Sequence, residues 1–291
     1  MHRCLLVVLV GVLIGSGCGP VIAANKGPAM KVCMLKHNEP YSDFGTRSGF
    51  DHDVAAAVAR SSGRELVPVW IDNEPGITEI DDSDYPLGRL ARDECDAVFS
   101  VPGPARDSLS GQNALALGEP YYGAAFELLA CAADFPAGFR SLRGRKVAIQ
   151  SQTVAHFALA MVKADSKNYF SLGAAYKGLL SGEAEAALLW GPTSGWQLRI
   201  AARSGAMLRN TSLAECGFVK DYQPPAAVRW NLHVATRQPH KRLRTDIDKA
   251  LATMIAEGEL DRIKHAYGIP KHEPFSSTYD LGAINDLQSA H

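Results

Sequence analysis

Residues 30–63 of the chain read MKVCMLKHNEPYSDFGTRSGFDHDVAAAVARSSG. A short apolar run, MKVCML, ends in a polar turn, and FDHDVAAAVARSSG follows with the spacing of an amphipathic helix that Gly63 closes. The same alternation predicts strands at ELVPVW, DAVFSV, AAFELLACA, RKVAIQ, EAALLW and NLHVAT, a helix at VAHFALAMV, and a helix pair over residues 241–268. Strands separated by helices predict an α/β architecture with largely parallel sheets.

Two α/β lobes are expected from this order. The first takes residues 30–127 and, after the chain returns, 227–275; the second takes 128–226; residues 276–291 remain as a peripheral C-terminal tail. Within the first lobe, IDNEPGITEIDDSDYPLG is acidic and punctuated by Pro and Gly, which predicts a long surface loop. Its run Asp81–Asp84 offers oxygen ligands to Ca²⁺, but it lacks the Gly and terminal Glu of an EF-hand loop, so a solvated acidic face is the better interpretation.

The N-terminus carries the pattern of an export signal. His2 and Arg3 precede an apolar run at 5–14, and a small-residue cleavage site follows. This pattern predicts a signal peptide over residues 1–24 and a periplasmic protein, because the apolar run is too short for a membrane span. Cys18 leaves a lipid anchor open as an alternative. With a net charge of −1 and no basic block, the chain is expected to bind no nucleic acid. A monomer is expected.

Four cysteines would remain after cleavage, namely Cys33, Cys95, Cys131 and Cys216. An even number of cysteines in an exported protein favours disulfides, and the chain has no C-x-x-C or His/Cys cluster that would indicate a metal site. Three pairings are open, and we expect Cys33–Cys95 and Cys131–Cys216, one in each lobe. Buried free thiols are the alternative.

Three stretches of the chain resemble the family 3 periplasmic solute-binding proteins: MKVCMLKHNEPYSDFGTRSGFDHDVAAAVA, GEPYYGAAFELLA and WNLHVATRQPHKRLRTDIDKALATMIAEGELDRIKHAYGIP. The resemblance implies a bilobal periplasmic-binding-protein fold of type II, with a ligand cleft between the lobes. In amino-acid binders of that family, an Arg ahead of the P-Y segment clamps the ligand carboxylate, and Arg106 is the candidate here. An Asp at a second-lobe strand end holds the ammonium, but here AALL leads into Trp190, Gly191 and Pro192. Since a buried ammonium without its partner costs about 3–5 kcal/mol, the pocket is not suited to a free amino acid unless Glu185 or another acid substitutes.

Within that family, the sequence resembles a subgroup associated with PQQ-dependent (quinoprotein) methanol and alcohol dehydrogenases. The resemblance rests on LLWGPTSGWQLR, on ECDAVFSVPGP with Cys95 and Asp96 in register, and on Cys33 in the first strand. The stretch PARDSL departs from the pattern of the subgroup, as does the length of the acidic segment before Asp93. The resemblance implies a non-enzymatic accessory protein that binds the apo-dehydrogenase, its cofactor or a cytochrome and assists assembly.

Two other functions stay open. The first is the substrate-binding subunit of an ABC importer for a small solute that is not an ordinary α-amino acid. The second is an enzyme, for which His37, Glu39 and Glu119 are the acid–base candidates at the cleft edge, although no motif links any two of them. No permanent cofactor is expected, and PQQ is a candidate ligand.

The predicted cleft combines aromatic side chains, loop ends and a helix start. An alternative interpretation is that Trp190 and Pro192 pack beneath the cleft and that one of Tyr121 and Tyr122 belongs to the core. Gln150–Thr153 are also explained as capping groups of the following helix, although such a helix start is equally suited to an anion. The cleft residues we expect are His37, Asn38, Tyr41, Ser100, Arg106, Tyr121, Tyr122, Gln150, Ser151, Thr153, Trp190, Gly191 and Pro192.

Overall fold

The computed structural model describes residues 27–73, 85–103, 115–204, 207–208, 211–212 and 215–289. The predicted signal peptide, Cys18, the acidic run Asp81–Asp84 and Arg106 lie outside these residues. Among the described helices, none combines the length and the apolar character needed to cross a membrane.

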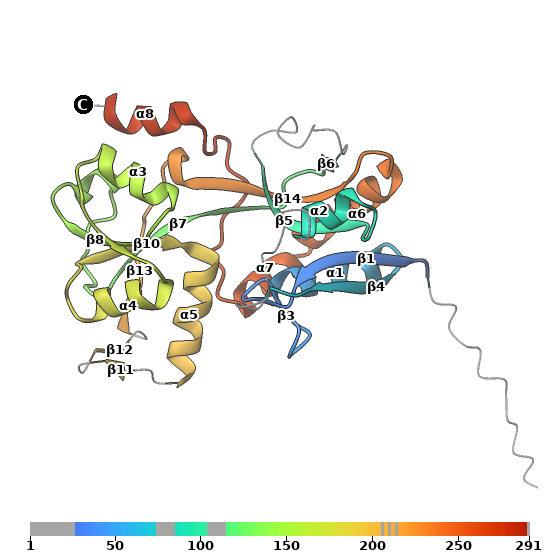
Figure 1. Cartoon of the computed structure of the whole chain (residues 1–291), viewed down its shortest axis with the longest axis horizontal. Coiled ribbons are helices and arrows are strands. Elements are labelled where there is room, and N and C mark those ends of the chain that lie inside the picture. Colours follow the sequence, from blue (N-terminus) through green and yellow to red (C-terminus); the bar gives the residue numbers. More distant parts are fainter. Residues whose placement is uncertain are drawn as a thin grey trace, which may run out of the picture.

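Two α/β lobes lie side by side and are joined by two long strands, β7 (Tyr122–Ala130) and β14 (Arg229–Arg237) (Figure 1). The strand order is β4-β1-β5-β14-β7-β10-β8-β9, so one sheet path passes from the first lobe to the second. The predicted α/β class and bilobal architecture are confirmed.

The first lobe is built on parallel strands covered by helices from both ends of the chain. β1 pairs in parallel with β4 and β5, and α1 buries Phe50, Val54 and Val58 at four-residue spacing in the core of the lobe. Its elements are β1 (Ala29–Leu35), β2 (His37–Asn38), β3 (Ser42–Asp43), α1 (Phe50–Ser61), β4 (Glu65–Ile71), α2 (Pro86–Ala91), β5 (Ala97–Gly103), β6 (Leu115–Leu117), α6 (Lys241–Ala256) and α7 (Glu259–Ala266).

The second lobe repeats this arrangement. β10 and β9 both run parallel to β8, and α4 starts at Ser171, whose Oγ accepts a hydrogen bond from the Ala174 amide at 3.2 Å. Its elements are η2 (Phe139–Leu142), β8 (Lys146–Gln150), α3 (Val154–Met161), β9 (Asp165–Tyr169), α4 (Leu172–Leu180), β10 (Ala186–Trp190), α5 (Gly191–Ser204), β11 (Met207–Leu208), β12 (Thr211–Ser212), β13 (Gly217–Phe218) and η4 (Ala226–Val228).

The connection between the lobes lies within strand β7. Residues 122–125 of β7 pair antiparallel with β14, and residues 126–129 pair antiparallel with β10. All nine residues of β7 are buried, and apart from Glu127 they form an apolar run, as is expected for a strand covered on both faces. The lobes therefore meet at a packed sheet and not at a solvated linker.

Both predicted disulfides are confirmed. Cys33 in β1 bonds to Cys95, which precedes β5, with 5.7 Å between the Cα atoms. Cys131 at the end of β7 bonds to Cys216 just before β13, with 3.9 Å between the Cα atoms. Each bond therefore links two neighbouring strands of the sheet in one lobe.

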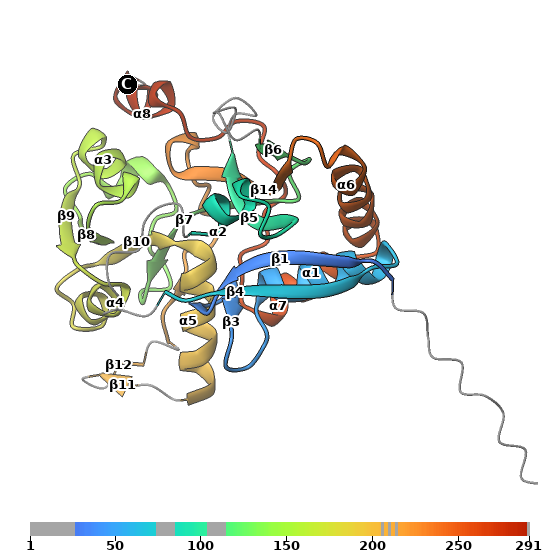
Figure 2. The ribbon, with the colours of Figure 1, turned by 45° about the vertical axis from the view of Figure 1, so that its right-hand side comes forward.

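The end of the chain differs from the peripheral tail that was expected. After α7, the chain crosses back over β14, where the ring of Tyr279 stacks on Trp230 with 5.2 Å between centroids, and forms α8 (Leu281–Ser289). Figure 2 shows α8 above α3, and Ala283, Ile284 and Leu287 pack on the core of the second lobe. The short segment LGAINDLQS carries too few apolar residues for its sequence pattern to show this contact.

Candidate functional site

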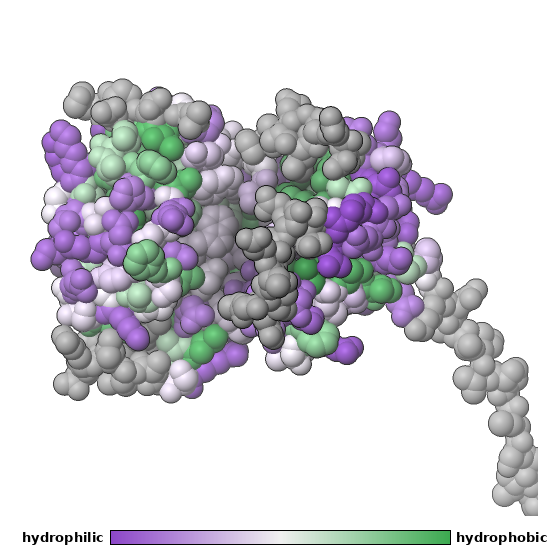
Figure 3. Space-filling view, in the orientation of Figure 1, coloured by the Kyte–Doolittle hydropathy of each residue, from purple (hydrophilic) through white to green (hydrophobic). Residues whose placement is uncertain are grey.

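A cavity of about 280 Å³ lies between the lobes near their connection. The space-filling view shows a recessed and mostly pale surface there (Figure 3). Four of the predicted cleft residues come together in it: Asn38, Tyr41, Ser100 and Trp190. The residues that line the cavity are Asn38, Tyr41, Asp51, Phe99, Ser100, Pro102, Trp190 and Leu232.

Ser100 reaches the cavity because its strand is bulged. The pairing of β5 with β14 shifts register between His233 and Ala235, and Ser100 adopts a φ of 51°. Such a bulge re-aims a side chain, and a positive φ is uncommon for a residue other than glycine. Ser100 Oγ donates to Asp51 Oδ1 at 2.5 Å, and the Ser100 amide donates to Tyr121 Oη at 3.0 Å. Two neighbours therefore hold the strained residue in place.

Tyr41 is placed by the turn that starts helix α1. The Phe50 amide donates to Pro40 O at 2.7 Å, and the Asp51 amide donates to Tyr41 O at 2.9 Å. These bonds satisfy two of the amides that a helix start leaves unpaired. They hold the turn against α1 and bring Tyr41 and Asp51 to the same cavity.

Trp190 connects the two lobes at this point. Its Nε1–H donates to Tyr41 Oη at 2.7 Å, across 149 positions of sequence. The centroid of its ring lies 5.5 Å from that of Phe126 and 5.8 Å from that of Trp230. The ring also packs against the hydrophobic cores of both lobes. Trp190 thus lines the cavity and also packs beneath it, so the two interpretations of this residue hold together.

Sequence reasoning missed four of the lining residues, Asp51, Phe99, Pro102 and Leu232, and Asp51 is the ionisable one among them. Burial raises the pKa of Asp51 to about 7, and the hydrogen bond from Ser100 lowers it in part. An acid in the first turn of a helix is ordinary, so the sequence pattern does not single it out. The cavity therefore contains a carboxyl group that titrates near neutral pH.

Two predicted cleft residues are core residues instead. Tyr121 is 2% exposed and Tyr122 is fully buried, and burial raises the pKa of both hydroxyls well above the usual range. The prediction that one of the two rings faces the cleft is wrong, because β7 starts at Tyr122 in the middle of the sheet, where both faces are covered. Tyr121 contributes to the cavity indirectly, because its hydroxyl accepts a hydrogen bond from the amide of Ser100, which lines the cavity.

Gly191 and Pro192 are also buried and lie outside the cavity lining. A Cβ on Gly191 would meet Glu127 Cγ at 2.6 Å and Ala125 O at 2.9 Å. Both residues lie at the start of α5, where Gly191 packs against strand β7, which connects the lobes. The prediction that they belong to the cleft is therefore wrong, and their role is packing.

Four further predicted residues that the structure describes do not line this cavity. His37 is exposed in β2. Gln150 ends β8, Ser151 and Thr153 follow it, and all three are partly exposed. Thr153 stands at the N-cap of α3, but its Oγ1 donates to Gln150 O at 2.9 Å, and α3 has no side-chain cap. The predicted capping is wrong for this reason, and an anion site at this helix start stays a prediction.

Two acids named as candidates lie elsewhere. Glu185 precedes β10 and accepts a hydrogen bond from Arg145 Nη1 at 2.9 Å, so it does not replace the missing strand-end Asp. Glu119 lies near α6, where its amide donates to Asp248 Oδ1 at 3.0 Å. Asp51 is the acid of the cavity.

One group of described residues has the spacing of metal ligands. Ligand atoms of His37, Glu39 and Asp43 all lie within 4.8 Å of one another. Both oxygens of Asp43 already accept hydrogen bonds from the turn, one from Gly45 and the other from Thr46, and these bonds lower the pKa of Asp43. This arrangement is that of an Asx turn at the surface.

The lobes also touch along helix α5. A Cβ on Gly195 would lie 1.8 Å from Gly268 O, so the backbone of α5 contacts the end of α7 directly. In the same contact, the centroids of the Trp196 and Tyr267 rings lie 5.7 Å apart. A glycine is required at position 195 because any side chain would push the two helices apart.

Replacing Gly195 with alanine should therefore lower the free energy of unfolding by about 1–3 kcal/mol. Chemical denaturation followed by circular dichroism measures this change. Gly173→Ala in α4 is the matched control, since a Cβ there meets nothing within 4 Å and alanine favours the helix. Equal stability of the two variants would contradict the close contact.

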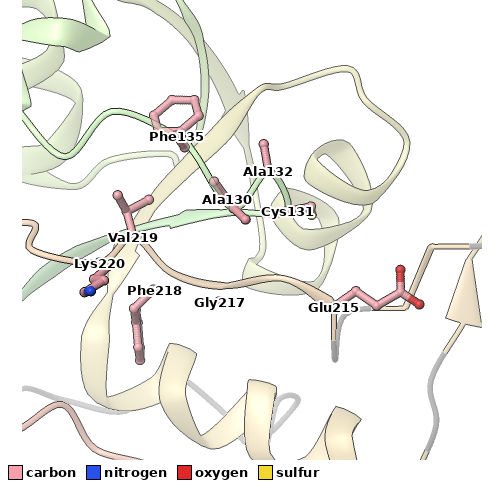
Figure 4. Close-up of a pocket in the computed structure, with 10 residues that line it drawn as sticks. Ala130, Cys131, Ala132, Phe135, Glu215, Gly217, Phe218, Val219 and Lys220 are labelled. Atoms are coloured by element: carbon pink, nitrogen blue, oxygen red, sulfur yellow. The ribbon is translucent and has the colours of Figure 1, made fainter.

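A second hollow of about 180 Å³ lies beside the Cys131–Cys216 disulfide. Figure 4 shows Glu215 and Lys220 at opposite ends of its lining segment, with Phe135 and Val219 at one side. No titratable cluster converges there among the residues that line it.

Comparison with solved structures agrees on the fold. The chain is similar to MxaJ from Methlophaga aminisulfidivorans MPT, with 18% identity, TM-score 0.58, and coverage of 83% of this chain and 99% of that one. It is similar to substrate-binding domain 2 of Lactococcus lactis GlnP in an open conformation, with 16% identity, TM-score 0.65, and coverage of 83% and 96%. It is also similar to the unliganded L-cystine solute receptor of Neisseria gonorrhoeae, with 16% identity, TM-score 0.64, and coverage of 84% and 93%.

No protein-family model and no curated protein sequence matches the chain. The structural likenesses show that the chain has the bilobal type II periplasmic-binding-protein fold.

Proposed function

We propose that this protein is a periplasmic solute-binding-like accessory protein of a PQQ-dependent methanol or alcohol dehydrogenase. It binds the apo-enzyme or its cytochrome through the cleft between its lobes and assists assembly of the active enzyme. The observation that carries the proposal is Trp190, which takes the strand-end place where an amino-acid binder presents an acid and is hydrogen-bonded across the lobes to Tyr41.

The chemistry of the cavity supports this proposal over amino-acid binding. A zwitterion needs a cationic clamp for its carboxylate, but none of the described lining residues is cationic. Rigid aromatic surfaces such as those of Tyr41 and Trp190 instead provide contact area at low entropic cost, as protein interfaces use them.

The Cys33–Cys95 disulfide agrees with the proposal. It ties two of the segments on which the resemblance to the dehydrogenase-associated subgroup rests, the first strand and the stretch ECDAVFSVPGP. The likeness in fold to MxaJ agrees with the proposal, although a likeness at 18% identity reports the fold alone.

The described lining of the cavity is better suited to a protein partner than to PQQ. A quinone that carries carboxylates would meet the carboxyl group of Asp51 there, without a cation among the described lining residues to offset the repulsion. We therefore propose that the cleft binds a protein partner. PQQ binding at the start of α3 stays a separate prediction.

The proposal predicts that tagged protein, purified from the periplasm of its own host, brings down a quinoprotein dehydrogenase or its cytochrome. Mass spectrometry of the captured proteins measures this. The matched control is the Gly173→Ala variant, whose substitution is exposed on α4 and away from the cavity, and it should capture the same proteins. Capture of the membrane subunits of a transporter, or of neither class of protein, would overturn the proposal.

The second candidate function is the substrate-binding subunit of an importer for a small solute. The open cavity of about 280 Å³ favours it, because that volume suits a small ligand. A free ligand at a hundred times its dissociation constant should stabilise the fold by about 2.7 kcal/mol. Thermal unfolding with a library of solutes separates the two functions, since the accessory protein should show no such gain with the common amino acids.

A further inference from the structure

The described part of the cavity lining holds one carboxyl group and three aromatic rings. The carboxyl group is that of Asp51, and the rings are those of Tyr41, Phe99 and Trp190. We propose that this cavity receives an organic ammonium group, with Asp51 as its counter-ion and the three rings around it. The ammonium belongs either to a small free amine or to a lysine side chain of the partner. This inference deepens the proposed function by naming what the cleft recognises, and it rests on that function only for the second source.

The hydrogen bonds of Asp51 leave room for such a group. Its Oδ1 accepts from Ser100 Oγ, while its Oδ2 accepts no hydrogen bond from any residue that the structure describes. A carboxylate oxygen at a cavity wall is the partner that an ammonium N–H requires, and such charge-assisted bonds are stronger than neutral ones.

The rings favour a cation for a second reason. An ammonium is attracted to the face of an aromatic ring, most strongly to that of tryptophan. The Trp190 N–H already donates to Tyr41, so it is not a free donor for an anionic ligand.

An anion finds few donors in the same place. The Ser100 hydroxyl donates to Asp51, and the first amides of α1 donate to the carbonyls of Pro40 and Tyr41. Among the described lining residues, the Asn38 amide is the remaining side-chain donor besides the Tyr41 hydroxyl.

Titration of Asp51 should make the binding depend on pH. The titratable groups that face Asp51 are the hydroxyls of Tyr41, Tyr121 and Tyr122, and burial keeps all three protonated at neutral pH. Because burial raises the pKa of Asp51 to about 7, the carboxylate that a cation needs is lost as the pH falls below 7. Affinity for an ammonium should accordingly fall between pH 8 and pH 6.

Isothermal titration calorimetry of the purified protein tests the proposal. The probes are methylammonium, choline, the amide of Nα-acetyl-lysine, and 3,3-dimethylbutan-1-ol, which has the shape of choline without its charge. At least one of the three cations should bind, and the neutral alcohol should bind at least about tenfold more weakly than choline if choline is the ligand. Asp51→Asn should weaken cation binding roughly ten- to hundredfold, as expected for the loss of a charge-assisted bond.

Two controls separate binding from folding. Asp53→Asn removes a carboxylate from the same helix that is bonded to Tyr267 and does not line the cavity, so it should leave cation binding unchanged. Asp51→Asn should remain folded. The folded protein holds the Asp51 proton up to about pH 7 whereas the unfolded chain releases it near pH 4, so the wild type loses stability as the pH rises through this interval. The variant should not show that loss.

The outcomes decide both the chemistry and its source. Tighter binding of methylammonium or choline identifies a small free ammonium compound, and preference for the lysine amide identifies a partner side chain. The proposal would be overturned if all three cations failed to bind at millimolar concentration, if choline bound but the neutral alcohol bound equally well, or if Asp51→Asn left cation binding unchanged. Capture of the dehydrogenase is a separate readout, so failure here and failure of the proposed function are distinguishable.

Discussion

Replacing Cys131 and Cys216 together with alanine should lower the free energy of unfolding by roughly 4 kcal/mol. The bond joins residues 85 positions apart, and its loss releases that loop in the unfolded chain. The same bond attaches the segment before β13 to the end of β7, beside the buried core of the second lobe. Urea unfolding monitored by circular dichroism, with and without a thiol reductant, measures the effect.

The Cys33–Cys95 pair provides the internal comparison. Its separation is 62 positions, and because loop entropy grows only with the logarithm of length, its removal should cost almost the same. Reductant should destabilise the wild type and leave a variant without the four cysteines unchanged. A loss below about 1 kcal/mol for either pair would mean that the reduced, unfolded chain keeps its loop closed by other contacts.

The fold was predictable because its signals are local. Apolar runs separated by an amphipathic helix predicted β1, α1 and β4, and the 16-residue helix α6 shows the same strong periodicity. The cysteine pairing could be expected as well, although three pairings were open on the sequence alone. Strand β10 also ends at Trp190 as expected, since the apolar run stops there.

The contacts of the site were less predictable, because they depend on which side of a strand or helix each residue faces. Tyr121 and Tyr122 look suited to a cleft in the sequence, but the central pairing of β7 buries both. Asp51 looks like an ordinary first-turn acid, and only the bulge at Ser100 and the turn at Tyr41 bring it into a cavity. The hydrogen bond between Tyr41 and Trp190 joins residues 149 positions apart, and no local pattern reports such a pair.

Replacing Trp190 with alanine should lower the free energy of unfolding by about 3 kcal/mol, the lower end of the range for a buried aromatic, because the ring is only partly buried. The variant loses the contacts with Phe126 and Trp230 and leaves Tyr41 without the donor at 2.7 Å. Since the ring packs on the cores of both lobes, its loss should also loosen the position of one lobe relative to the other. Capture of the dehydrogenase should fall together with stability, and the two effects have to be separated.

Two further variants make the separation. Trp190→Phe keeps an aromatic ring in the cavity and removes the N–H together with part of the indole, so it should cost about 1–2 kcal/mol and retain most of the capture. Trp70→Ala removes a ring that packs on the first lobe beside His52 and does not line the cavity, so it should lower stability without affecting capture. If Trp190→Ala lowers stability but captures the dehydrogenase as well as Trp70→Ala does, the ring is structural and the assignment of the cleft fails. If capture is lost with Trp190→Ala and kept with the other two variants, the π surface at this strand end is what the partner recognises, which explains why a tryptophan replaces an acid there.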